Sequence, residues 1–69
     1  MVYQLLLADA EDRPRRSGVV FCADDERARA SAVALLRADP AHGSVQVLQE
    51  GREVAHIRRR DLEPALADA

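Results

Sequence analysis

The chain has almost none of the residues that usually cross-link a small protein. Only one of its 69 residues is a cysteine, Cys22, so no disulfide can form within the chain. Tryptophan and lysine are absent, tyrosine and phenylalanine occur once each, and the three glycines lie too far apart to form a phosphate-binding loop. A domain of this size buries a thin core, so association with a second copy is the remaining way to stabilise it.

The chain also lacks a long hydrophobic run. The apolar stretch Leu5–Leu7 is short and no basic segment precedes it, so we expect neither a signal peptide nor a membrane-spanning helix. A single free cysteine without an export signal favours a reducing cytoplasm. The formal net charge is -2, from 12 acidic and 10 basic residues, which is not the strongly basic balance of a typical nucleic-acid-binding domain.

Residues that carry catalysis or hold a cofactor are few. His42, His56 and Cys22 do not have the spacing of metal ligands, so we expect no metal and no other cofactor. The acidic run 24–26 is explained by helix capping, which leaves no paired carboxylates for acid–base chemistry. Because no set of nucleophile, base and orienting group can be assembled, we expect that the protein is not an enzyme.

The clearest pattern is one helix between Asp24 and Asp39. Asp24 is the predicted N-cap, and Pro40 ends the helix because it excludes the α conformation at Asp39. Apolar residues recur at helical spacing and predict a buried stripe of Ala28, Ala32, Leu35 and Leu36, with Val33 at its edge.

Short runs of strand character flank the helix on both sides. Alternation predicts strands at 2–8, 18–22, 44–49 and 53–58, the second beginning as early as Arg15. Between the last two strands we expect a three-residue turn with Gly51 in the left-handed region. That turn places the apolar residues of both strands on one face, namely Val45, Val47, Ala55 and Ile57.

Together these elements predict an α+β fold: a four-stranded, mainly antiparallel sheet in the chain order ββαββ, with one helix packed on one face. The strand order within the sheet stays open. We expect residues 1–60 to form this single domain and residues 61–69 a C-terminal tail. In that tail, Asp61 either caps one helical turn or the segment frays.

Three segments carry a resemblance to known sequences. They are the strand end Ala8-Asp9-Ala10, the helix start Ala23-Asp24-Asp25-Glu26, and the final hairpin, Val45-Gln46-Val47 with Glu50-Gly51-Arg52-Glu53-Val54-Ala55. Over residues 2–58 the chain resembles a group of small uncharacterised bacterial proteins of ββαββ type. The resemblance implies the same architecture and a bacterial origin. It implies no activity, and no functional residue is carried over.

Apolar residues on the second face of the predicted sheet favour a partner. If the helix covers the face with Leu5 and Leu7, the other face carries Val2, Leu6, Leu48 and Val54. Tyr3 and Phe21 are expected in the core or half-buried. Four aliphatic side chains on adjacent strands form a patch of roughly a few hundred Å2, the size of many interaction sites. We therefore predict a homodimer joined by the helix-free face of the sheet or by an edge strand, and a small non-enzymatic protein that acts through self-association or a protein partner.

Two arginine clusters support an alternative function. One is Arg58, Arg59 and Arg60, the other Arg13, Arg15 and Arg16. Guanidinium groups match phosphate oxygens in pairs, so the first cluster is a candidate anion contact, and the alternative is a nucleic-acid-associated module. Acidic residues flank both clusters and aromatic residues for base stacking are scarce, which disfavours this alternative.

Overall fold

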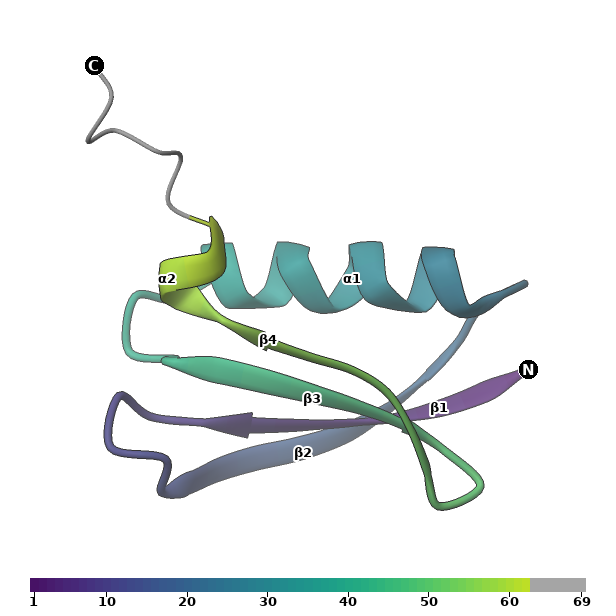
Figure 1. Ribbon diagram of the computed structural model, residues 1–69, viewed down its shortest axis with the longest axis horizontal. Coiled ribbons are helices and arrows are strands. Elements are labelled where there is room, and N and C mark those ends of the chain that lie inside the picture. Colours follow the sequence, from purple (N-terminus) through teal and green to yellow (C-terminus); the bar gives the residue numbers. More distant parts are fainter. Residues whose placement is uncertain (63–69) are drawn as a thin grey trace.

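The computed structural model describes residues 1–62 as a four-stranded sheet with a helix across one face (Figure 1). In chain order the elements are β1 (Val2–Ala8), β2 (Pro14–Phe21), α1 (Asp25–Ala38), β3 (Ser44–Gln49), β4 (Arg52–Arg58) and α2 (Arg59–Leu62). Each pair of neighbouring strands is antiparallel. The predicted α+β fold in the order ββαββ is confirmed.

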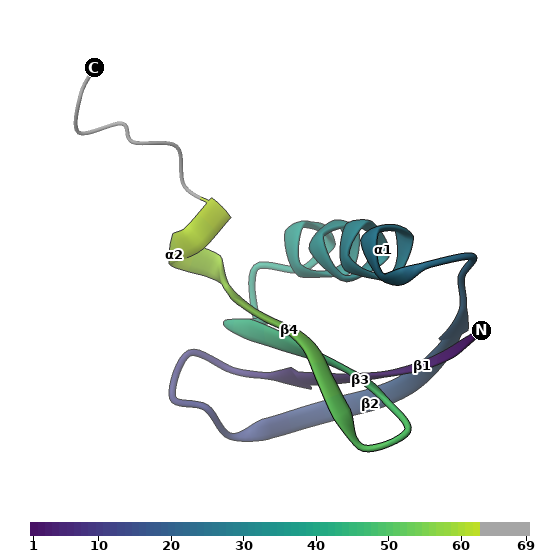
Figure 2. The same ribbon diagram turned by 45° about the vertical axis from the view of Figure 1, so that its right-hand side comes forward.

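The strand order is β2-β1-β3-β4, so β1 and β3 form the centre of the sheet and β2 and β4 its edges. Helix α1 covers one face only (Figure 2). It packs mainly against β3 and β4 and leaves β2 largely uncovered. The molecule thus has two layers, with the core between them.

Helix α1 begins and ends where the sequence predicts. An Asp24 carboxylate oxygen accepts a hydrogen bond from the Arg27 backbone N–H (2.8 Å), the N-cap contact that satisfies an otherwise unpaired donor. Asp25 and Glu26 place negative charge in the first turn, which the helix dipole favours. Asp39 is extended (φ -135°) ahead of Pro40, as the proline requires.

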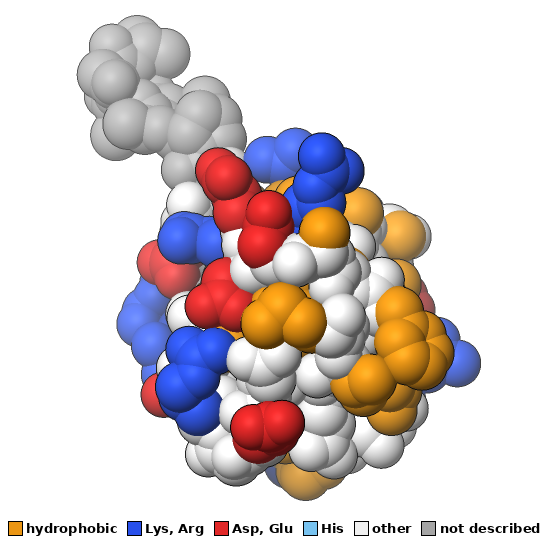
Figure 3. Space-filling view, turned by 90° about the vertical axis from the view of Figure 1, so that its right-hand side faces the viewer, with side chains coloured by type: hydrophobic (Ala, Val, Ile, Leu, Met, Phe, Trp, Pro, Cys, Tyr) orange, Lys and Arg blue, Asp and Glu red, His pale blue; other side chains and the backbone are white. Residues whose placement is uncertain are grey.

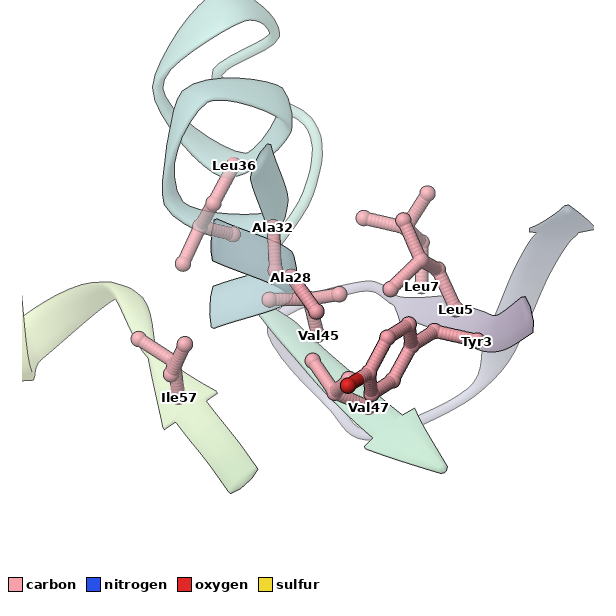
Figure 4. Packing of buried hydrophobic residues seen from close by; sticks show 9 residues of the cluster. All are labelled: Tyr3, Leu5, Leu7, Ala28, Ala32, Leu36, Val45, Val47 and Ile57. Carbon is pink, nitrogen blue, oxygen red and sulfur yellow. The ribbon is translucent and has the colours of Figure 1, made fainter. Parts of the chain in front are cut away.

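Among residues 1–62, nine hydrophobic residues form the core, and Figure 4 shows them pointing into the space between α1 and the sheet. They are Tyr3, Leu5, Leu7, Ala28, Ala32, Leu36, Val45, Val47 and Ile57. The prediction that Leu35 belongs to the buried stripe is wrong, because its side chain is 41% exposed. The helix lies over β3 and β4, so the flank that carries Leu35 faces the side of β2, where α1 and the sheet separate.

The turn between β3 and β4 differs from the prediction. Gln49 pairs with Arg52, which leaves a two-residue turn in which both Glu50 (φ 50°) and Gly51 (φ 79°) are left-handed. The apolar residues still share one face because the register shifts by one residue further along β4. Val47 pairs with Ala55 but Leu48 pairs with Glu53, so Val54 is the extra residue of a β-bulge.

The connection from α1 to β3 passes close to the first hairpin. The Gly43 N–H donates to the Ala8 carbonyl (2.7 Å), and the Gly43 carbonyl accepts from the Arg59 N–H (2.9 Å). A Cβ at residue 43 would lie 2.6 Å from the Asp9 carbonyl oxygen and 2.7 Å from the Ala10 nitrogen. Glycine is required here for close approach of two backbone segments.

Helix α2 is a single turn that crosses the predicted domain boundary at residue 60. It begins at Arg59 rather than after Asp61, and an Asp61 oxygen accepts from the Arg58 N–H (3.0 Å), as in a capping box. Leu62 packs against the core. The remainder of the predicted tail, 63–69, lies outside the described residues. Within residues 1–62 no helix is long and apolar enough to cross a membrane.

Candidate functional site

The face of the sheet that points away from α1, called here the open face, carries most of the predicted interface. Residues of β1 alternate, so Val2, Gln4 and Leu6 lie on the open face while their neighbours Tyr3, Leu5 and Leu7 are buried under α1. Leu48 pairs with Gln4 and shares its face. Val2, Leu6 and Leu48 are therefore on the face where the sequence placed them, and their role as an interface stays a prediction.

Val54 does not join these three residues. It packs against the buried cluster, because the bulge changes the alternation of β4 at this point. Glu53, paired with Leu48, takes the cross-strand position that the sequence pattern assigned to Val54.

Two apolar residues of the open face were missed. Phe21 pairs with Val2 and Val19 pairs with Gln4, so both lie on the open face, where Phe21 is 77% and Val19 64% exposed. The expectation that Phe21 is at least half-buried is wrong. Val19 and Phe21 point to one side of the strand and Val20 to the other, so both sides are apolar. Only the register with β1 decides which side faces away from α1. We call Val2, Leu6, Val19, Phe21 and Leu48 the open-face patch.

The open-face patch is concentrated where β1 starts and β2 ends. Val2 is 49% exposed and, with Leu48 and Met1, lines a shallow hollow at this end of the sheet. Figure 3 looks onto this end, and hydrophobic side chains gather along one side of it, beside a surface of mixed acidic and basic side chains. An exposed aromatic beside exposed aliphatic residues is the composition of a protein-binding surface.

The topology brings the two arginine clusters to the opposite end of the sheet. Ala8, Ser44 and Arg58 are cross-strand neighbours there, and β2 starts beside them with Arg15 and Arg16. The sequence places these clusters more than forty positions apart and does not reveal that they meet.

Arg59 is not a free member of this cluster. Its guanidinium donates hydrogen bonds to the main-chain carbonyls of His42 (2.8 Å), Asp39 (2.8 Å) and Leu36. These carbonyls lie at the C-terminus of α1 and just beyond it, where a positive charge is favourable. Arg59 therefore caps the helix, and the candidate anion contact is reduced to Arg58 and Arg60, whose side chains are exposed.

Replacing Arg59 with alanine is expected to lower the free energy of unfolding by about 2 kcal/mol, because three partly buried carbonyls lose a charged hydrogen-bond donor. Arg60→Ala, the matched control at an exposed position, is expected to change it by less than about 0.5 kcal/mol. Urea unfolding followed by circular dichroism measures both. Equal stabilities for the two variants would contradict the capping role.

Acidic groups balance much of the charge at the arginine end. Arg13 forms ion pairs with Asp9 (3.2 Å) and with Glu11. The Arg13 and Glu11 backbone N–H groups donate to Asp9, and the Arg13 hydrogen bond contributes most to holding the pKa of Asp9 below its usual value. The pKa of Asp39 is also lowered, first by the Ala41 N–H and then by nearby positive groups that include Arg15 and Arg16.

A second polar cluster ties the start of α1 to the sheet. The buried Tyr3 hydroxyl donates to an Asp25 carboxylate oxygen (2.7 Å), and the other Asp25 oxygen lies 3.5 Å from the Arg52 guanidinium. Burial, followed by the hydrogen bond to Asp25, raises the pKa of Tyr3 to about 12. Tyr3 is therefore a neutral donor at physiological pH, with a structural role.

The remaining chemistry-bearing residues do not converge. Within residues 1–62 no three histidine, cysteine, aspartate or glutamate side chains are placed to hold a metal ion. Cys22 is half-buried with its Sγ 3.8 Å from the Ser31 hydroxyl. His42 is buried, and its Nδ1 has no hydrogen-bond partner among the described residues.

Comparisons with models of protein families, with curated proteins and with solved structures find no match for this chain. The resemblance to small bacterial ββαββ proteins therefore stays a prediction.

Proposed function

We propose that this chain is a small, non-enzymatic interaction protein of the cytoplasm that acts through self-association or a protein partner. The single observation that carries the proposal is the open-face patch, above all Phe21, whose side chain is 77% exposed on an edge strand. Large aromatic side chains that stand out from a surface are typical anchors of protein interfaces.

The thin core supports the same proposal. Two of the nine core residues are the small alanines of α1, and the largest fully buried side chains are Tyr3, Leu36, Val45 and Val47. A domain of this size is marginally stable alone, so burial of Val2, Val19 and Phe21 in a dimer adds stability that the monomer lacks. A two-fold dimer buries each anchor twice.

A nucleic-acid-associated role is the second candidate, because Arg15, Arg16, Arg58 and Arg60 are exposed at one end of the sheet. The contacts around these arginines favour a nucleic-acid role less than self-association. Arg59 is engaged by the helix, Arg13 by acidic neighbours, and the exposed aromatic Phe21 lies at the other end of β2. Stacking and phosphate contacts would therefore not fall on one surface.

The proposal predicts a dimer that depends on Phe21. At about 100 μM, well above a micromolar dissociation constant, light scattering should give twice the monomer mass for the parent chain. Phe21→Arg places a positive charge in the open-face patch at the end of β2 and should give the monomer mass, while the core stays intact because residue 21 is exposed.

Ala41→Arg is the matched control. Ala41 is exposed in the turn after α1, remote from the open-face patch, and the substitution adds the same charge. It should remain dimeric. A parent chain that stays monomeric at this concentration would overturn self-association, and a Phe21→Arg variant as dimeric as the control would overturn the role of the open-face patch in the dimer.

A further inference from the structure

Strand β2 presents an unused row of backbone hydrogen-bonding groups. Met1 and Cys22 exchange two backbone hydrogen bonds, from the Cys22 N–H to the Met1 carbonyl (2.9 Å) and from the N-terminal amine to the Cys22 carbonyl (3.0 Å). In an antiparallel pair such doubly bonded positions alternate, so in β2 Val20, Gly18 and Arg16 bond to β1. The N–H and C=O groups of Ser17, Val19 and Phe21 therefore point away from the sheet.

Among residues 1–62, β1 is the only strand beside β2. The opposite edge, β4, is interrupted by the bulge at Val54, a feature that discourages further pairing. From Arg16 to Phe21 the register of β2 is regular, with no bulge and no proline. This is a free strand edge six residues long, which is enough for a strand of ordinary length to pair.

The space beside β2 is also open on the helix side. A groove of about 760 Å3 separates β2 from α1, and its apolar lining includes Val20, Ala34, Leu35 and Ala38. At Gly18, which shares this side, a Cβ would meet nothing within 4 Å. A strand added next to β2 thus finds apolar surface on both faces: the groove on the helix side, and Val19 with Phe21 on the open face.

We infer that β2 of a second copy pairs with this free edge. The two strands run antiparallel about a two-fold axis at Val19, so that two sheets join into one of eight strands. This inference rests on the proposed self-association and names its geometry. With Val19 opposite its counterpart, Ser17 is opposite Phe21, and Gly18 is opposite Val20 of the second copy. The missing side chain at Gly18 leaves room for that valine.

Charge makes this arrangement complementary to itself. Arg15 and Arg16 lie at the start of β2, and the exposed acids Asp24 and Glu26 follow its end. Antiparallel pairing about Val19 brings the start of β2 in each copy, with Arg15 and Arg16, toward the end of β2 in the other copy, which Asp24 and Glu26 follow. Each end of the joined strands then pairs a basic segment with an acidic one, which favours a second copy over an unrelated strand.

Amide hydrogen exchange measured by NMR at about 100 μM tests the geometry without any substitution. In the edge-paired dimer the amides of Ser17, Val19 and Phe21 should be protected at least tenfold more than in the diluted, monomeric protein. The amides of Gly18 and Val20, which bond to β1 in either state, serve as internal controls. A dimer in which the three outward amides exchange as fast as in the monomer would overturn edge pairing and leave self-association standing.

A pair of variants separates backbone pairing from side-chain contact. Val19→Pro removes an outward N–H, which an edge strand tolerates, and should give a folded monomer. Val19→Thr removes apolar surface but keeps the N–H. It should stay dimeric, with a dissociation constant raised at most tenfold. A dimeric Val19→Pro variant would overturn the inference. If Val19→Pro does not fold, the exchange pattern of the parent chain decides, and a parent chain that never dimerises overturns the inference together with self-association.

Discussion

Replacing Gly43 with alanine is expected to lower the free energy of unfolding by about 3 kcal/mol, a large share of the total for a domain this small. The added Cβ would lie 2.6 Å from the Asp9 carbonyl oxygen and 2.7 Å from two Ala10 backbone atoms. These are main-chain atoms, so no side-chain rotation relieves the overlap. If residue 43 instead moves away from Asp9 and Ala10, the hydrogen bonds that it makes with Ala8 and Arg59 are weakened.

Gly18→Ala is the matched control for this prediction. A Cβ at Gly18 meets nothing within 4 Å, and alanine there reduces the freedom of the unfolded chain, so stability should change by less than about 0.5 kcal/mol. Both variants are compared with the parent by urea unfolding at the lowest concentration that circular dichroism allows, so that any dimer contributes little. Equal loss of stability in the two variants would show that close packing at Gly43 is not the cause.

The second large effect is expected at Leu36. Its side chain is fully buried between α1 and the sheet, and Leu36→Ala should cost about 3 kcal/mol through lost apolar burial and the cavity left behind. The adjacent Leu35 is the natural comparison, because it has the same side chain on the same helix and is 41% exposed. Leu35→Ala should cost less than about 1 kcal/mol.

Thermal and urea unfolding of the two leucine variants measure this difference directly. Since each substitution replaces leucine with alanine within one helix, intrinsic helix propensity cancels from the comparison. A cost at Leu35 equal to that at Leu36 would mean that the helix sits nearer to β2 than described and that the groove between them is closed.

The sequence by itself determined the local elements of this protein. Asp24, Pro40 and the alternation of Val45, Gln46 and Val47 act through neighbouring backbone groups, so α1 and the four strands were predicted with their type and, apart from the start of β2, nearly their bounds. The chain order ββαββ followed, because a single helix between two strand pairs has few ways to bury one face of a sheet.

Only the tertiary structure decided which further residues complete the open-face patch and which one leaves it. Strand order places β2 at an edge and exposes Phe21, while the bulge in β4 turns Val54 inward; neither depends on local propensity. The same holds for Arg59, whose partners are main-chain carbonyls 17 to 23 residues away. The end of a helix always leaves carbonyl groups without a partner in the helix, but no sequence pattern shows that β4 brings Arg59 beside those of α1.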